Sequence, residues 1–257
     1  MDARYHATAH GQKTNPRSPA AQHGCETCHG PGKAHVDAGG DKTKIISFTA
    51  ARASEAQAVC AQCHNRGEHA FFESSTHARH NVTCVTCHSV HKFLSQTSQL
   101  KAKDELQTCA GCHRPETMKI LRVMHMPVRE GKMTCSNCHN PHGSTNKAML
   151  RVGNSITEMC TSCHGAQRGP FLWEHPVTRD SCTVCHDPHG SSNNRMLVAK
   201  PPLLCQRCHV STRHPSTVYD LNTFRTTSGN RLFGRGCVEC HQNIHGSNHP
   251  SGTFFLR

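Results

Sequence analysis

The sequence predicts an elongated fold of short α-helices and coil, with almost no β-structure, wrapped around something other than a protein core. Hydrophobic residues make up only 35% of the chain, below the roughly 45–50% usual for globular domains. Glycine (19) and proline (13) are frequent among the 257 residues, and no stretch sustains the alternation of a strand. The third observation is a set of 18 cysteines in one recurring motif.

This motif is Cys-x-x-Cys-His, which occurs nine times and leaves no cysteine over. It is the attachment sequence of c-type haem, in which two thiols add to the two porphyrin vinyl groups and the histidine reaches the iron from one face. We therefore expect nine covalently attached haem c groups. The expected attachment residues are Cys25, Cys28, Cys60, Cys63, Cys84, Cys87, Cys109, Cys112, Cys135, Cys138, Cys160, Cys163, Cys182, Cys185, Cys205, Cys208, Cys237 and Cys240. The expected proximal iron ligands are His29, His64, His88, His113, His139, His164, His186, His209 and His241.

Two other interpretations use the same cysteines. Nine disulfides would give no reason for a histidine after every second cysteine. Structural zinc sites combine two separated ligand pairs and do not need a contiguous Cys-His. Haem attachment explains both the spacing and the histidine.

Nine porphyrins leave about 29 residues for each haem, so the macrocycles themselves are expected to form the core. The formal net charge of +12 would by itself suggest a nucleic acid or an anionic surface as partner. The propionates add roughly −18 and the ferric centres roughly +9, which brings the loaded protein near neutrality. We therefore expect the basic residues to neutralise propionates, and no nucleic-acid partner.

The motifs recur at intervals of 22 to 35 residues and alternate in type, which predicts a repeating unit of two haems. We expect one domain with an irregular part over 1–59, regular repeats over 60–204 and a C-terminal haem pair over 205–257. Short helices are expected near SEAQAVCAQCH and NSITEMCTSCH, with the motif at or beyond the helix end.

A low-spin haem needs a second axial ligand, and 15 of the 24 histidines lie outside the motifs. The nine expected distal ligands are His10, His77, His91, His125, His142, His175, His189, His214 and His245. We expect exchange within each pair: a histidine just after a motif serves the preceding haem, and a linker histidine serves the following one. Glycines directly follow three of these histidines, at Gly143, Gly190 and Gly246, which suits either a backbone pressed against a haem or a simple turn.

At the N-terminal end this scheme assigns His10 to the haem at Cys25 and leaves His35 without an iron. The other histidines are expected to be exposed or to contact propionates; they are His6, His23, His69, His80 and His249. The chain contains no run of 18 apolar residues and no signal peptide. Because such haem attachment occurs outside the cytoplasmic membrane, we interpret the sequence as a mature or N-terminally shortened periplasmic form.

The paired motifs carry more specific sequence around them. The segment RGPFLWEHPVTRDSCTVCHDPHGSSNNRML (Arg168 to Leu197), the earlier CSNCHNPHGS and the ending CHQNIHGSNHPSG resemble the MtrA/DmsE family of decahaem cytochromes over essentially the whole chain. The resemblance implies a periplasmic electron wire, associated with the outer membrane and inserted in a β-barrel porin. Implied partners are a periplasmic donor cytochrome or quinol dehydrogenase and an extracellular multihaem cytochrome or reductase. The family has ten haems, and the motif absent here would lie just before Met1, so we expect either a truncated sequence or a nine-haem variant.

We expect electron transfer and no enzymatic activity, because no motif departs from Cys-x-x-Cys-His and free histidines are in surplus. One alternative is a multihaem reductase, which would need an open axial position on one iron. The other is a soluble periplasmic shuttle without a porin. The direction of electron flow is not encoded in these motifs.

Overall fold

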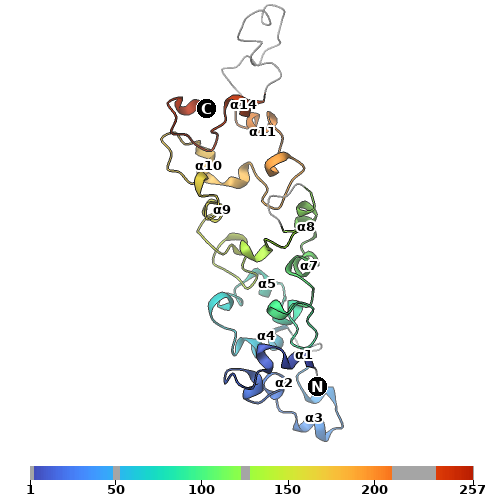
Figure 1. Ribbon diagram of the computed structural model, residues 1–257. Helices are drawn as coiled ribbons and strands as arrows, with labels where there is room; N and C mark the ends of the chain where they lie inside the picture. Colours follow the sequence, from blue (N-terminus) through green and yellow to red (C-terminus); the bar gives the residue numbers. More distant parts are fainter. Residues whose placement is uncertain (1–2, 49–52, 123–127, 210–235, 257) are drawn as a thin grey trace, which may run out of the picture. The chain divides into compact units, whose positions relative to one another are not determined.

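Short helices joined by coil make up the chain in the computed structural model, which describes residues 3–48, 53–122, 128–209 and 236–256 (Figure 1). The α-helices are α1 Ala3–His6, α2 Glu26–His29, α3 Lys33–Asp37, α4 Ala53–Ala61, α5 Thr76–Arg79, α6 Cys84–Cys87, α7 Glu105–Ala110, α8 Arg114–Ile120, α9 Ile156–Thr161, α10 Pro176–Asp180, α11 Leu203–Gln206 and α14 Cys237–Cys240. The 3-10 helices are η1 Ala9–Gly11, η2 Pro19–Ala21, η3 Lys42–Lys44, η4 Gly67–His69, η5 Thr97–Gln99, η6 Cys135–Asn137, η7 Lys147–Met149, η8 Gly165–Gln167, η9 Cys182–Val184, η10 Asn194–Met196 and η11 Gly252–Phe254.

Within these ranges the structure contains no strand, only four isolated β-bridges. Three of the bridges close the same kind of loop, joining a motif histidine to a leucine 11 or 12 residues later: His88 to Leu100, His139 to Leu150 and His186 to Leu197. The expectation of helix and coil with almost no β-structure is confirmed.

The helices begin at polar caps and carry the motifs at or near their ends. Asp104 caps α7 by accepting a hydrogen bond from the Gln107 amide, and Ser155 caps α9 in the same way through the Glu158 amide. Such caps satisfy amides that have no partner inside the helix. The helices expected near SEAQAVCAQCH and NSITEMCTSCH are confirmed as α4 and α9.

The chain forms two compact units. Unit 1 comprises Met1–Arg114 and Gly131–Arg151, and unit 2 comprises Pro115–Glu130 and Val152–Arg257. The proposed division into haem-pair repeats within one domain stays a prediction.

Little apolar surface is buried by the protein itself. Among the described residues only Ala56, Ile120, Leu150 and Met196 are buried hydrophobics, and no large side chain is fully buried. Large apolar side chains such as Leu172 (77% exposed) and Val36 (71% exposed) lie open. So few buried apolar side chains cannot form a protein core by themselves, which agrees with porphyrins as the core.

Within the described ranges, no helix has the length and apolar character needed to cross a lipid bilayer.

Candidate haem sites

All nine motifs fold into the same backbone turn. In each one the amide of the histidine donates a hydrogen bond to the carbonyl of the first cysteine, at 2.9–3.0 Å. One turn of this kind brings two thiols and an imidazole together, as attachment to a single porphyrin requires. None of the 18 thiols is in a disulfide, and each is exposed or half-exposed.

Imidazole rings face each other in pairs at one recurrent distance. Six pairs join a motif histidine to a histidine outside the motifs: His10–His64 (5.9 Å between ring centroids), His29–His91 (6.2 Å), His77–His113 (6.1 Å), His88–His142 (6.1 Å), His175–His209 (6.0 Å) and His186–His245 (6.2 Å). An imidazole nitrogen binds a metal ion at about 2.0–2.1 Å, so two rings on opposite sides of one iron have centroids about 6–6.5 Å apart. The six pairs therefore fit a bis-histidine haem iron.

The pairs follow a different order from the predicted exchange. His10 faces His64 of the motif at Cys60, not His29, so its assignment to the haem at Cys25 is wrong. The predicted exchange also fails for the paired histidines that directly follow a motif. Each of these faces the histidine of the motif two places earlier, and not that of the preceding motif. His91 faces His29, and His142 faces His88. Six of the expected distal histidines therefore face a motif histidine, but each faces a different motif from the one predicted.

Contacts between thiols explain this order. The first cysteines of consecutive motifs are in hydrogen-bonding contact at Cys60–Cys84, Cys109–Cys135 and Cys160–Cys182. Second cysteines of consecutive motifs are neighbours at Cys28–Cys63, Cys87–Cys112 and Cys185–Cys208. Thiols attach at porphyrin edges, so consecutive haems would meet edge to edge. In this arrangement the histidine that faces the second side of a haem iron comes from beside a motif that is not the next one along the chain.

Backbone carbonyls hold many of the facing rings through Nδ1. Five motif histidines have such a contact: His29 with Ile46, His88 with Ser98, His139 with Ala148, His186 with Arg195 and His241 with Phe254, at 2.5–2.9 Å. Two distal histidines have one too, His77 with Pro141 (2.8 Å) and His175 with Ile244 (3.0 Å). A hydrogen bond at Nδ1 fixes the tautomer that presents Nε2 to a metal.

The residues that supply these carbonyls were not among the predicted site residues. Ser98, Ala148 and Arg195 have φ of 57°, 53° and 56°, the left-handed region, and this bend turns the carbonyl toward the motif histidine. A signal was present in the recurring endings SQL, AML and RML, each placed about ten residues after a motif histidine.

Burial keeps several distal imidazoles neutral. Burial, followed by the nearby rings of His69 and His88, lowers the pKa of His142 to about 4. Burial likewise lowers the pKa of His10, of His175 and of His245. A neutral imidazole keeps a lone pair for a metal ion at neutral pH. The buried Nδ1 atoms of His10 and His142 have no hydrogen-bond partner.

Most of the remaining histidines lie where they were expected. His6, His23, His80 and His249 are exposed. His69 is half-buried instead, with its ring 4.2 Å from that of His142 and 5.5 Å from that of His64. His69 is therefore not exposed, because η4 carries it between two of the facing pairs, and the alternative expectation of a contact with a propionate stays a prediction.

His35 lies on α3, with Nδ1 2.8 Å from the Asp41 carbonyl. Among the described ring contacts no histidine faces it, and its lack of an iron stays a prediction. Two expected ligands, His125 and His214, lie outside the described residues. Four further expected ligands lie in the described residues but outside the six facing pairs: His139, His164, His189 and His241.

Glycines following the distal histidines make close approaches to protein atoms. Gly143 has a φ of +104°, and a Cβ there would lie 2.5 Å from the Phe71 carbonyl oxygen. At Gly246 (φ +140°) a Cβ would lie 2.2 Å from the Phe171 ring. The amides of Gly143 and Gly246 donate to the carbonyls of Asn140 and Asn243, so both glycines lie in turns, and a contact of their backbone with a haem stays a prediction.

Comparison with known proteins agrees with this geometry. The family model described as "Doubled CXXCH motif" matches residues 125–169 and 175–214, each of which contains a linker histidine followed by two motifs. A protein of Shewanella baltica (strain OS185), named multiheme cytochrome MtrA, is 38% identical over 252 residues, which span 96% of this chain and 75% of that protein.

Proposed function

The chain belongs to the MtrA family of multihaem c-type cytochromes, and from this premise we propose that it conducts electrons through nine bis-histidine haems, between the periplasm and the cell exterior, with an outer-membrane porin as partner. As a multihaem cytochrome it binds haem c covalently and transfers electrons. The number of haems, the route and the partners are the proposal.

One observation carries the proposal: six histidine pairs already have the spacing of two axial ligands on one iron. Bound haem supplies one-electron redox chemistry at the iron. The chain's own part is to attach each porphyrin by two thiols, to orient two imidazoles and to leave no axial position open. Full axial ligation favours electron transfer over substrate chemistry.

The proposed ligand set is the nine motif histidines with His10, His77, His91, His125, His142, His175, His189, His214 and His245. Contacts between the thiols of consecutive motifs support a haem order that follows the sequence within each unit. An electron would then pass between neighbouring edges, without a long gap between successive haems.

The family resemblance supports a periplasmic location at the outer membrane and the porin partner. A polar protein surface is not stable against acyl chains, so a wire across a bilayer needs a protein sleeve. The donor would be a periplasmic cytochrome or a quinol dehydrogenase, and the acceptor an extracellular multihaem cytochrome or reductase. Electron flow in the opposite direction, from the cell exterior to the periplasm as in iron oxidation, would need the same haem ligands.

Two measurements test the haem proposal. Mass spectrometry of the purified holoprotein is expected to give nine haems per chain, and electron paramagnetic resonance of the oxidised protein is expected to show low-spin iron alone. A substantial high-spin signal would favour the multihaem reductase, because it reveals an open axial position.

A third experiment tests the conduit. The holoprotein is purified from its native membrane with its associated proteins and placed in liposomes that enclose a redox dye. External reductant is expected to bleach the dye only when both the cytochrome and a porin are present. Isolation without any porin, together with full activity as a diffusible electron carrier, would favour the soluble shuttle.

A further inference from the structure

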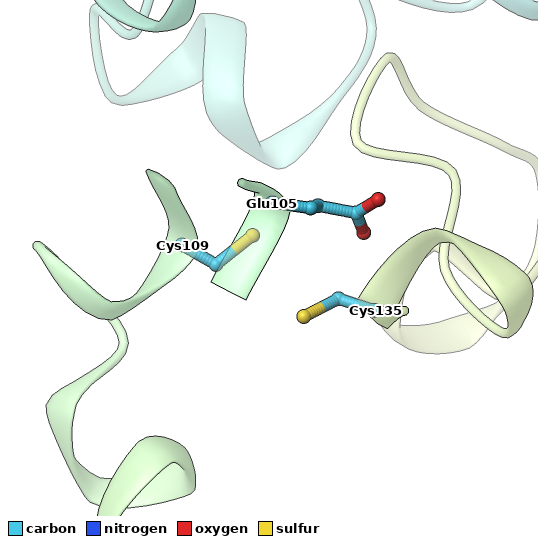
Figure 2. A group of neighbouring side chains, drawn as sticks. All are labelled: Glu105, Cys109 and Cys135. Atoms are coloured by element: carbon cyan, nitrogen blue, oxygen red, sulfur yellow. The ribbon is translucent and has the colours of Figure 1, made fainter. Parts of the chain in front are cut away.

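A carboxylate lies where two successive motifs of unit 1 meet (Figure 2). Glu105 is the first residue of α7, directly after its cap Asp104. Its carboxylate accepts hydrogen bonds from the Ser136 amide (2.5 Å) and from the Ser136 hydroxyl (2.8 Å). These two contacts tie the helix that carries Cys109 to the 3-10 helix that begins at Cys135.

The same carboxylate lies beside two sulfur atoms. An oxygen of Glu105 and the Sγ atoms of Cys109 and Cys135 all lie within 4.8 Å of one another, and Figure 2 shows the three side chains converging. Three such ligands resemble a metal site. Both sulfurs belong to haem-attachment motifs, however, and stand for the thioethers of two porphyrins in the holoprotein. Glu105 therefore lies at a junction of two haem edges.

Equivalent positions at other junctions carry no charge. Four residues before the first cysteine of a motif, Glu105 corresponds to Ala56 in α4, to Ile156 in α9 and to Pro201 before α11. Ala56 is buried, with 1% of its surface exposed. Among these four described positions, only the one at the junction between Cys109 and Cys135 holds a carboxylate.

The Glu105 carboxylate acts on the sulfurs through its charge. The hydrogen bond with Cys135 and burial raise the pKa of the Cys109 thiol most, and the negative charges of Cys135 and then of Glu105 raise it further. Arg151 donates to the Ser136 carbonyl and pairs with the Glu68 carboxylate. A negative charge that disfavours a thiolate also disfavours an added electron on a neighbouring haem.

We propose that Glu105 sets the reduction potentials of the haems attached at Cys109–Cys112 and Cys135–Cys138, holding both lower than an uncharged residue at this junction would. This role rests on the proposed electron conduit. With Glu105 charged, the two haems at this junction of unit 1 have lower reduction potentials and give up electrons more readily.

The test compares the parent holoprotein with two variants of Glu105 in a potentiometric titration, with haem methyl resonances followed by nuclear magnetic resonance. In Glu105→Gln, which keeps the size and an acceptor for the Ser136 amide, the ratio of reduced to oxidised iron at two haems is expected to rise by a factor on the order of ten. That factor corresponds to about 59 mV for a one-electron couple. Glu105→Asp keeps the charge and is expected to titrate like the parent.

Two further variants separate the charge from its position. Asp104→Asn removes a carboxylate one residue away and is expected to shift the two haems by less than Glu105→Gln does. Ile156→Glu places a carboxylate at the corresponding position of unit 2, and is expected to lower the potentials of the haems at Cys160 and Cys182.

The outcomes are distinguishable. Superimposable titrations of the parent and Glu105→Gln, with nine low-spin haems in both, would overturn the role of Glu105 and leave the conduit standing. Equal shifts in Glu105→Gln and Glu105→Asp would show that the hydrogen bonds matter and not the charge, and would also overturn it. A parent with open or missing haems would instead overturn the proposed function itself.

Discussion

At the scale of single residues, the chain is organised by pairs of imidazoles. A motif histidine held through Nδ1 by a backbone carbonyl and a distal histidine kept neutral by burial face each other about 6 Å apart, as His88 and His142 do. The two rings come from segments that are distant in sequence. Substitution of one ring should therefore affect one iron.

Replacement of His142 by methionine is expected to raise the potential of the haem at Cys84–Cys87 alone, because a thioether ligand favours the ferrous iron. A methionine-to-iron charge-transfer band in the optical spectrum, with a shift in one component of the potentiometric titration, checks this. Methionine substitution at the exposed His80 is the control, with no change expected. A shift of a haem other than the one that His88 binds would contradict the pairing.

His10 and His35 give a second prediction. His10→Ala is expected to leave the iron at Cys60–Cys63 with an open axial position, because His10 faces His64. His35→Ala is expected to leave every low-spin iron intact. Electron paramagnetic resonance measures the high-spin fraction in both variants. High-spin iron in His35→Ala would show that His35 is a ligand.

The sequence predicted the chemistry of these residues better than their pairing. Attachment cysteines and motif histidines follow from covalent spacing, which acts within five residues. The pairing of His91 with His29 depends on how distant segments pack, and no local rule describes that. For the same reason the position of His69 against His142 was not foreseen.

At the scale of elements, the repeated unit is a loop and not a helix. After each of three motifs the chain leaves the histidine, bends through left-handed residues and returns in a β-bridge at a leucine, as at His139, Ala148 and Leu150. The loop positions both the proximal carbonyl and the distal histidine that follows the motif. Short helices, and the lack of strands in the described ranges, were predictable from glycine and proline content. The bridges were not, because a single pair of residues leaves no periodic pattern.

The turn at Gly143 yields a prediction at this scale. Gly143→Ala is expected to destabilise unit 1 by roughly 3 kcal/mol, because the added Cβ meets the Phe71 carbonyl and the backbone conformation is strained. Because His142 is adjacent, a high-spin fraction is expected at the haem that His88 binds. Thermal unfolding and electron paramagnetic resonance check both effects.

Gly24→Ala is the matched control. Gly24 also has a positive φ (+59°), but nothing lies within 4 Å of the added Cβ. A loss of only about 1 kcal/mol is expected there, from backbone strain alone. Equal losses at the two sites would show that the contact with Phe71 is unimportant.

At the scale of the whole molecule, protein alone does not build the interior. The few buried apolar side chains of the described residues are small or isolated, and several large ones lie open. Expression without cytochrome c maturation proteins is therefore expected to give an unfolded chain, because burial by the protein is too small to offset chain entropy.

Limited proteolysis and circular dichroism of the apo chain check this dependence on haem. The mature holoprotein is the control and is expected to resist protease. A compact apo chain that unfolds cooperatively would contradict the expectation.

The facing order of the rings also has a consequence for biogenesis. Under the proposed ligation, the iron attached near His29 is completed by His91, and that near His186 by His245. A chain that enters the periplasm with its N-terminus first must carry these haems with one empty position until a later segment arrives, whereas a haem such as that at Cys60, whose facing ring His10 precedes the motif, has no such delay. Export and haem attachment are therefore staggered, and loss of the last residues of the chain would open an iron site more than 50 residues upstream.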